Sequence, residues 1–442
     1  MHRAFQRRRR HLMDLAEPGA IIIVASAREV IRNGDSYYPF RQDSDFLYLT
    51  GLNEPDAVLV LLPGRASGEQ ILFCREHDPD RERWDGPRLG LKSAVDQLQI
   101  DDSFPISDLD DILPGLMEGR ERIYHLVGRD PQFDQRVIGW RNLLLEQKRN
   151  VASPEEFIAL DHLLHELRLV KCAEEIKRMR KAGRIAAAAH ARAMQACQPG
   201  LNETDLCAEL LHEFTRQGCP PSYLPIVASG ERALTLHYIQ NDQPLPKHGL
   251  VLIDAGCEVD GYASDISRTF PVNGTFSDAQ KAVYSVVLAA QQRAIDQARP
   301  GRSFIDIHQA ACRVLTEGLI DLGLLTGTVE DNLEQEHYRR FYMHKTGHWL
   351  GLDVHDVGDY QIEGASRVLE KNMVTTVEPA LYIDHADDVP EAFRGIGIRI
   401  EDDIRITDDE PENLTADVPV QIDEIEALMA TSALNTGQHP AR

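Results

Sequence analysis

The sequence contains no apolar run long enough to cross a bilayer and no excess of basic residues. A spanning helix needs about 20 consecutive apolar residues, so no membrane partner is expected. Aspartate and glutamate outnumber lysine and arginine by 71 to 47, for a net charge of -24. A phosphate backbone is bound by a basic face, so this balance argues against nucleic acid as a partner.

The sequence also lacks any C-x-x-C pair, and its seven cysteines are scattered along the chain. This distribution is typical neither of a disulfide framework nor of a zinc ribbon, and it suits a reducing compartment. An arginine-rich start precedes the apolar run AIIIVA (20–25), which superficially resembles a targeting signal. Asp14, Glu17 and Pro18 interrupt the span, and the run is shorter than the core of about 7–15 residues that a signal needs. We therefore expect a cytoplasmic protein.

A chain of 442 residues is too long for one ordinary core, so at least two domains are expected. Residues 1–168 predict a smaller α/β domain, in which β-type apolar runs are followed by helical patterns. The runs lie at 20–25, 57–62 and 70–74, and the helical patterns at about 105–118 and 133–148.

The remainder of the chain predicts a larger α+β domain over 169–430. A long helical pattern covers about 155–197, and further helices are predicted over 277–298 and 303–323. Hairpin-like strands alternate with these two helices rather than forming a regular β-α-β repeat. The tail, 431–442, is expected to be disordered.

The stretch 253–270, IDAGCEVDGYASDISRTF, places two aspartates in apolar β segments. The turn signal EVDG predicts a hairpin that brings Asp254 and Asp265 close across the ladder, with the register open by one or two residues. Two carboxylates on a half-buried sheet repel one another unless a cation lies between them. A divalent metal ion would satisfy this condition. The alternative is a solvated strand on which Asp265 pairs with Arg268.

Three histidines occur in HKTGHWLGLDVHD (344–356). The spacing of His344 and His348 resembles the zinc motif H-E-x-x-H, but the catalytic glutamate is absent. Gly347 and Gly351 also disfavour a helix there, so this zinc-peptidase interpretation fails. We expect one or two of the three histidines to contact a metal.

Two further β segments end in or contain carboxylates. In VTTVEPALY (374–382), Glu378 closes a β-branched strand that Pro379 stops. In GIGIRIEDD (395–403), Arg399 and Glu401 are two residues apart and are predicted to share one face of a strand.

Together these segments supply four carboxylates and one imidazole, from Asp254, Asp265, His348, Glu378 and Glu401. Hard oxygen donors in this number suit a pair of divalent ions, with manganese or cobalt favoured over zinc. Two such ions hold and deprotonate a bridging water and polarise a carbonyl, as in dinuclear hydrolases and aminopeptidases.

The motif order, DAG…D-I-x-R-T-F, G-H-x-x-G-L-x-V-H-D, V-E-P and I-R-I-E-D, resembles the pita-bread metallopeptidases. These include methionine aminopeptidase, prolidase and aminopeptidase P, and the sequence is most similar to the bacterial aminopeptidase P family. The segments 37–61 and 82–90 resemble the first domain of that family, which methionine aminopeptidases lack. The resemblance implies a pita-bread (creatinase/aminopeptidase-like) catalytic domain of α+β class, preceded by a smaller α/β domain.

The resemblance also implies an activity and a set of residues. The activity is release of the N-terminal residue from peptides with proline in second position, by a metal-bridging hydroxide that attacks the Xaa-Pro carbonyl. Two divalent ions are implied, with manganese preferred and cobalt or zinc as alternatives. The implied ligands are Asp254, Asp265, His348, Glu378 and Glu401, and Glu378 would also pass the proton to the leaving nitrogen.

Further positions match the substrate side of the family's site. His237, His344 and His355 match histidines that bind substrate and stabilise the tetrahedral intermediate, while Tyr382 and Arg399 match residues that line the site. Trp84 matches a first-domain tryptophan that reaches the active site of a neighbouring subunit, which implies a homo-oligomer, either dimer or tetramer. The sequence departs from the family pattern at Lys345, which replaces a small residue, and at Ala380, which replaces a glycine.

Three alternatives remain. Prolidase shares the five ligands but cuts only dipeptides, and sequence separates it weakly from aminopeptidase P. A metal-free hydrolase of creatinase type and a non-enzymatic pita-bread interaction module are both disfavoured, because all five ligand positions are intact.

Overall fold

A computed structural model describes residues 2–147 and 152–435 of the chain. The chain divides into two compact units, Met1–Arg168 and Leu169–Arg442. Within the described ranges, no helix is long and apolar enough to span a membrane.

The first unit is built on a six-stranded mixed sheet with the order β6-β5-β4-β1-β7-β8. The apolar run at its centre pairs antiparallel with β4 and parallel with β7. The three predicted strand runs are confirmed as β1, β4 and β5. The strands of the sheet are β1 (Ala20–Ala25), β4 (Val58–Leu61), β5 (Gln70–Cys74), β6 (Asp102–Pro105), β7 (Arg122–His125) and β8 (Glu156–Ala159).

Helices α5 and α6 cover one face of this sheet, since their apolar side chains share a core with β1, β4, β5 and β7. The predicted helix over 105–118 begins only at Leu109, because 102–105 pairs with β5 as strand β6. Strands β2 (Ile31–Asn33) and β3 (Ser36–Tyr37) form a separate two-stranded hairpin after β1. The helices are α1 (His2–Leu15), α2 (Ser44–Thr50), α3 (Pro79–Asp85), α4 (Leu91–Leu98), α5 (Leu109–Met117), α6 (Pro131–Gln147) and α7 (Asp161–Leu169).

One buried carboxylate in the first unit is surrounded by cations. The Asp45 side chain, fully buried, accepts from Arg168 Nη1 at 2.7 Å and from Arg129 Nη1 at 2.6 Å. His165 Nε2 lies 3.3 Å from the same carboxylate. Burial alone would raise the pKa of Asp45, but the hydrogen bond with His165 and the charges of Arg168 and Arg129 hold it well below its usual range. These four residues are called the Asp45 cluster below.

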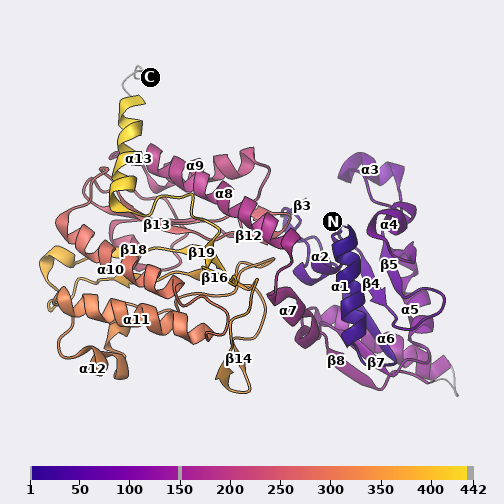
Figure 1. The fold of residues 1–442 in the computed structure, drawn as a ribbon. Helices are drawn as coiled ribbons and strands as arrows, with labels where there is room; N and C mark the ends of the chain where they lie inside the picture. Colours follow the sequence, from indigo (N-terminus) through magenta and orange to yellow (C-terminus); the bar gives the residue numbers. More distant parts are fainter. Residues whose placement is uncertain (1, 148–151, 436–442) are drawn as a thin grey trace. The chain divides into compact units, whose positions relative to one another are not determined.

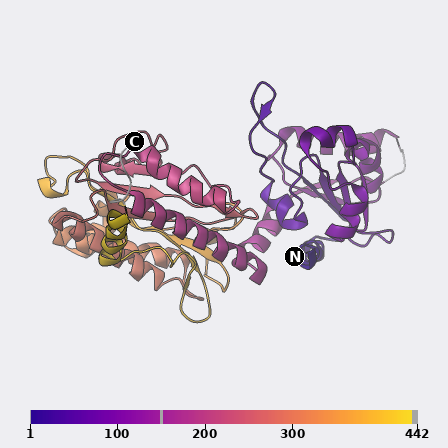
Figure 2. The same ribbon diagram turned by 90° about the horizontal axis from the view of Figure 1, so that it is seen from above.

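The second unit has two helix pairs, and Figure 1 shows α8 and α9 on one side of its strands and α10 and α11 on the other. Within each pair the helices pack along one another, which can be followed in the perpendicular view of Figure 2. The two predicted helices over 277–298 and 303–323 are confirmed as α10 and α11. The helices are α8 (Ala173–Ala196), α9 (Glu203–Arg216), α10 (Asp278–Ile295), α11 (Phe304–Asp321), α12 (Val329–Glu334) and α13 (Ile422–Asn435).

The strands between these helices form several small sheets, with the orders β13-β10-β9, β16-β19-β20 and β17-β18. They are β9 (Ile226–Ser229), β10 (Leu250–Asp254), β11 (Glu258–Val259), β12 (Tyr262–Ala263), β13 (Ser267–Pro271), β14 (Gln361–Ile362), β15 (Ala365–Ser366), β16 (Val374–Val377), β17 (Ala380–Tyr382), β18 (Gly397–Arg399), β19 (Asp402–Arg405) and β20 (Glu412–Asn413). This mixture of strands and helices is the α+β architecture that the sequence predicts.

Two sequence expectations differ from the structure. The helical region predicted over 155–197 is interrupted, because 156–159 pairs with β7 and a capping box between Cys172 and Glu175 starts α8 anew. Its two halves are α7 and α8. The tail expected to be disordered, 431–442, is helical as far as Asn435, and its remainder lies outside the described residues.

Candidate metal centre

The two aspartates of the 253–270 stretch lie close together, but not in the single hairpin that the sequence predicts. Asp254 ends β10 and is paired with Ser267 of β13, while Asp265 precedes β13 outside the ladder. Residues 258–263 form a separate small hairpin, β11 and β12. The reason is a close backbone crossing at Gly256, where a Cβ would lie 1.7 Å from the carbonyl oxygen of Ser264.

His348 and Glu378 are brought together by pairing between a loop and the edge of β16. Thr376 N donates to His348 O at 2.9 Å, and Glu378 N donates to Thr346 O at 2.8 Å. Glu378 directly follows β16, as the sequence predicts. The two segments approach so closely that a Cβ at Gly347 would lie 2.0 Å from Thr376 O. The loop is not helical, in keeping with the exclusion of the H-E-x-x-H motif.

Glu401 lies between β18 and β19, so the single strand expected over this stretch is two strands. Arg268, which is 1% exposed, binds Glu401 O through Nη1 at 2.6 Å and Asp402 through Nη2 at 2.8 Å. The alternative in which Arg268 pairs with Asp265 on a solvated strand is therefore wrong.

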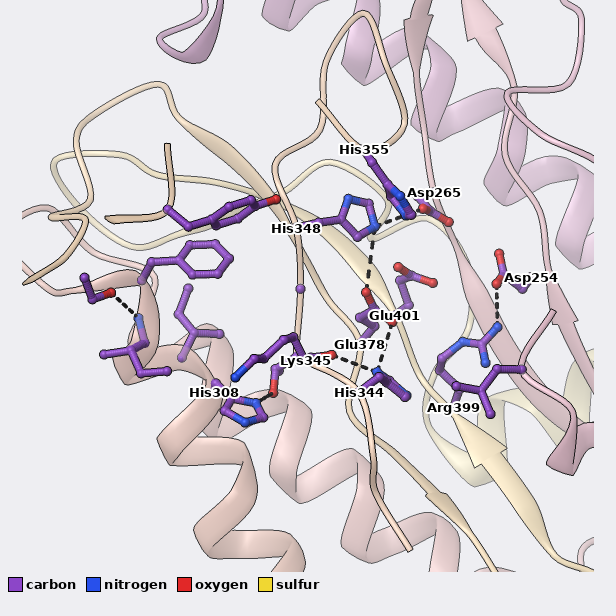
Figure 3. A pocket seen from close by; sticks show the side chains of 18 of the residues that line it. Asp254, Asp265, His308, His344, Lys345, His348, His355, Glu378, Arg399 and Glu401 are labelled. Carbon is purple, nitrogen blue, oxygen red and sulfur yellow. Dashed lines mark hydrogen bonds and ion pairs between the residues drawn. The ribbon is translucent and has the colours of Figure 1, made fainter. Parts of the chain in front are cut away.

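All five residues of the predicted ligand set line one pocket, of about 640 Å³ (Figure 3). Ligand atoms of Asp265, His348 and Glu401 lie within 4.8 Å of one another. His348 Nε2 is 3.5 Å from Asp265 Oδ2 and 3.7 Å from Glu378 Oε1. Asp254 accepts from Arg399 on the opposite side of the group.

The electrostatics of this group show that its carboxylates lack sufficient positive charge. Burial and the neighbouring carboxylates raise the pKa of Glu401 well above its usual range. Burial, partly offset by the charges of His348 and Arg399, raises the pKa of Glu378 to about 7. Although burial lowers it, the hydrogen bond to Asp265 and the charge of Glu378 bring the pKa of His348 up to about 9. A protonated histidine and one arginine thus face four carboxylates.

This arrangement fits divalent metal ions. The donors are four carboxylates and an imidazole, the ligand types that manganese, cobalt and zinc accept. His348 Nδ1 donates to Trp349 O at 3.0 Å, which leaves Nε2 as the ligand atom that faces the carboxylates. Bound cations would displace the proton from His348 and relieve the repulsion that raises the carboxyl pKa values.

Arg399 connects the ligand group to His344 through a chain of hydrogen bonds. Arg399 Nη1 donates to Tyr382 Oη at 2.8 Å, and Tyr382 Oη lies 3.1 Å from His344 Nε2. His344 Nδ1 lies 2.7 Å from Lys345 O, which can only accept, so the N–H of the neutral ring is at Nδ1. Burial and the charge of Arg399 lower the pKa of His344 to about 4, which keeps the ring neutral.

The remaining predicted site residues are found in three places. His237 and His355 line the pocket, and the His355 ring lies edge-on to His348 with centroids 4.3 Å apart. Tyr382 is 3% exposed and lies behind His344 and Arg399, outside the pocket lining. Trp84 is on α3 of the first unit and is 88% exposed.

Sequence reasoning missed two features of the site. Tyr223, in the loop before β9, places its hydroxyl within hydrogen-bond reach of both Asp254 and Asp265, which share its single proton. The far wall of the pocket, defined here as the apolar wall, comes from the start of α11 and from Tyr360; its residues are Phe304, Ile305, Ile307, His308 and Tyr360. Neither Tyr223 nor the apolar wall belongs to a sequence motif. An apolar residue at the start of an amphipathic helix is normally predicted to pack in the hydrophobic core, so the pattern does not reveal a pocket wall.

Comparisons with known proteins agree with this geometry. Residues 177–408 match the family model "Metallopeptidase family M24", and residues 5–124 match "Aminopeptidase P, N-terminal domain". The chain is 46% identical to the Xaa-Pro aminopeptidase of Escherichia coli over 435 residues, which cover 97% of this chain and 98% of the relative. Identity to the human Xaa-Pro aminopeptidase 3 is 36%, over 96% of this chain and 85% of that protein.

Solved structures give the same result for the fold. The aminopeptidase PepP of Pseudomonas aeruginosa superposes with a TM-score of 0.97 at 52% identity, covering 98% of this chain and 99% of that one. A zinc-substituted E. coli aminopeptidase P in complex with product superposes with a TM-score of 0.95 at 45% identity, with the same coverage. The chain therefore belongs to metallopeptidase family M24, in its aminopeptidase P branch.

Proposed function

We propose that this protein is an Xaa-Pro aminopeptidase, which releases the first residue from peptides that carry proline in second position. The observation that carries the proposal is the convergence of four carboxylates and His348 in one pocket of an aminopeptidase P relative. Two relatives, from E. coli and Haemophilus influenzae, match over at least 96% of this chain, and both are named Xaa-Pro aminopeptidases. This agreement favours aminopeptidase activity over that of a prolidase.

The proposed cofactor is a pair of divalent ions, preferably manganese, held by Asp254, Asp265, His348, Glu378 and Glu401. Such ions supply a hydroxide nucleophile at neutral pH and polarise the scissile carbonyl. The structure supports Asp265, His348 and Glu401 as one group of donors, and Asp254 extends it through the Tyr223 hydroxyl that it shares with Asp265. Arg399 and Ser267 orient Asp254 and Glu401 respectively, the latter by a 2.7 Å hydrogen bond.

Glu378 is the proposed carrier of the proton from the nucleophile to the leaving nitrogen. Its Oε1 faces His348 at 3.7 Å and its Oε2 faces His344 Nδ1 at 3.6 Å, so the carboxylate lies between the ligand group and the substrate side of the pocket. His237 and His355, on the pocket lining, are the proposed donors to the peptide oxygens. His344 borders the peptide as a neutral ring, because its N–H is held by Lys345 O and its Nε2 accepts from the Tyr382 hydroxyl.

Selection of proline has a physical basis in this pocket. An Xaa-Pro bond is a tertiary amide with no N–H, so a peptidase that grips this N–H fails on it. The pocket offers imidazole rings and apolar side chains against which a pyrrolidine ring can pack. We further propose a cytoplasmic homo-oligomer, dimer or tetramer, in which Trp84 contributes to the active site of a neighbouring subunit. Its near-complete exposure on α3 supports this role.

The experiment that tests the proposal is cleavage of an Xaa-Pro-Yaa tripeptide by chelator-treated protein, before and after addition of manganese. The matching Xaa-Pro dipeptide is the control substrate. We expect release of the first amino acid from the tripeptide only when metal is present. Turnover of the dipeptide alone would replace the proposal by a prolidase. No turnover of either peptide, with metal bound, would reject both activities.

A further inference from the structure

Lys345 is the one charged residue that lines the pocket outside the ligand group and Arg399, among the residues that the structure describes. It directly follows His344 in the chain. In the described part of the chain its ammonium group forms no hydrogen bond and no ion pair. A lysine at the rim of a substrate pocket with no acidic partner has its charge available to a ligand.

The side chain of Lys345 extends toward the apolar wall. Figure 3 shows it running away from His344, with its nitrogen directed toward His308 and away from the four carboxylates. The charge of Lys345 is also one cause, after burial, of the lowered pKa of His308, which is about 4. His308 is therefore neutral, and its Nδ1 is already bonded to Thr346 Oγ1 at 2.8 Å. Lys345 therefore supplies positive charge on this side of the pocket lining, and the charge of Arg339, outside the lining, adds to it at His308.

The direction of the peptide follows from the proposed chemistry. Glu378 passes the proton to the leaving nitrogen and faces His344, and Lys345 is the next residue along the same segment. The part of the peptide that follows the scissile bond therefore lies on the Lys345 side, while the free amine lies at the metal ligands. Two divalent ions would neutralise the four carboxylates, so the charge of Lys345 would not be cancelled by them.

We propose that Lys345 is a specificity-determining residue, which favours peptides with a carboxylate on the C-terminal side of proline. The carboxylate can come from an acidic side chain at the third position or from the free C-terminus of a tripeptide. This inference rests on the proposed aminopeptidase activity and names a preference within it. The pair is partly exposed to solvent, so the expected preference is about two- to fivefold.

The test compares kcat/KM of the manganese-loaded enzyme for matched peptides. Ala-Pro-Gln-amide is the neutral reference, Ala-Pro-Glu-amide adds a side-chain carboxylate, and Ala-Pro-Gln with a free C-terminus adds the terminal one. Glu-Pro-Gln-amide places the charge before proline. We expect one or both of the first two charged peptides to exceed the reference at low salt, and the excess to shrink at high salt because ions screen the pair.

Ratios within each variant are compared, so a general loss of activity cancels. Lys345→Gln is expected to bring the ratio to about one, Lys345→Arg to keep it, and Lys345→Glu to invert it. Lys177→Gln, which removes a lysine from the exposed face of α8, is the matched control and is expected to keep the wild-type ratio. Calorimetric binding of the products Pro-Glu-amide and Pro-Gln-amide gives the same comparison without turnover.

Each outcome separates this inference from the proposed function. If the wild-type enzyme leaves the neutral reference uncut, the proposed activity fails. If it cuts the reference but shows equal ratios in wild type and Lys345→Gln, Lys345 does not determine specificity. A preference confined to Glu-Pro-Gln-amide would overturn the placement of the leaving side beside Lys345.

Discussion

The two units of the chain bury carboxylates in opposite electrostatic settings. In the Asp45 cluster of the first unit, one carboxylate contacts two guanidinium groups and an imidazole, and its pKa is lowered. In the pocket of the second unit, four carboxylates face one guanidinium and one imidazole, and the pKa values of Asp254, Glu378 and Glu401 are raised. In each case burial opposes the charged form, and the balance of nearby charges and hydrogen bonds decides the direction of the pKa shift. In the pocket, despite burial, the hydrogen bond and charge of His348 lower the pKa of Asp265, while the pKa values of the other three carboxyl groups are raised.

This difference distinguishes an ion pair that serves the fold from a site that serves a ligand. A balanced cluster is complete within the protein, so removing the anion takes the carboxylate away from the buried Arg168 guanidinium. An unbalanced cluster is completed by cations from outside, and its repulsion is a stability cost that metal binding removes. Variants in the two units should therefore have opposite effects on stability and activity.

The largest effect is expected for Glu401→Gln. This variant removes a ligand charge from the second unit, and kcat/KM on an Xaa-Pro tripeptide should fall by more than about 100-fold, since even residues behind the ligands cost about 10–100-fold. The Tm of the metal-free protein should stay equal or rise, because the amide resembles the protonated acid that the raised pKa favours. Glu410→Gln, at an exposed surface carboxylate, is the control. Wild-type activity in Glu401→Gln would contradict the ligand assignment.

The opposite behaviour is expected for Asp45→Asn in the first unit. It leaves Arg129 and Arg168 beside a neutral group, and the free energy of unfolding should fall by about 3–5 kcal/mol in denaturant titration. Asp161→Asn removes a half-exposed carboxylate that lies 3.7 Å from Arg129, and it should cost less than about 1 kcal/mol. Equal losses of unfolding free energy in the two variants would show that the buried ion pairs of Asp45 stabilise the protein no more than the exposed pair of Asp161.

A smaller effect is expected for Tyr223→Phe. The variant removes the hydroxyl that Asp254 and Asp265 share and leaves every proposed ligand in place. The Kd for manganese, measured by calorimetry, should rise about tenfold, as for other groups that orient metal ligands. Tyr284→Phe, whose hydroxyl donates to Val420 O, is the matched control and should bind manganese as the wild type does. An unchanged Kd in Tyr223→Phe would show that the Tyr223 hydroxyl does not contribute to manganese binding.

The smallest effect is expected from pH on the metal-free protein. The folded-state pKa of Glu378, about 7, lies above its ordinary value of 4.5, and that of His348, about 9, lies above 6.5. Both groups bind protons more tightly when folded, so their stabilisation is present at low pH and is lost as pH rises through the folded-state values. The Tm of chelator-treated protein should fall by a few °C between pH 6 and pH 9. The fall should be absent with manganese bound.

The Asp45 cluster has the reverse sign. Its folded-state pKa lies below the ordinary value of 3.8, so its contribution is present above that value and is lost as pH falls below it. A Tm that rises from pH 6 to pH 9 in the metal-free protein would contradict the assignment of charges in the second unit.

The sequence predicted the site better than the strands that carry it. The motifs named five residues that the structure gathers in one pocket, because each motif joins a polar residue to an apolar β segment where a carboxylate is costly. The positions where the strands begin and end were predicted less accurately. A pattern of apolar residues does not show where two backbones cross, so the displacement of Asp265 from the ladder could not be read from 253–270.

The residues missed by sequence reasoning are those whose function depends on tertiary contact alone. Tyr223 reaches Asp265 across 42 positions of the chain. Phe304 and Ile307 occupy the first turns of α11, where apolar periodicity predicts core packing equally well. Arg268 was named from the sequence only as an alternative partner of Asp265, and its burial with a hydrogen bond to Glu401 O could be seen only in the fold.

The close approach at Gly347 has a consequence for how the site can change. The spacing between His348 and Glu378 is set where main chain touches main chain, with no room for even a methyl group. Replacing side chains around the pocket can change the ligand atoms that it offers, but the distance between the backbones of His348 and Glu378 is fixed by this main-chain contact. The range of ionic radii that the pocket accepts therefore depends on the fold and should persist when residues of the pocket wall are replaced.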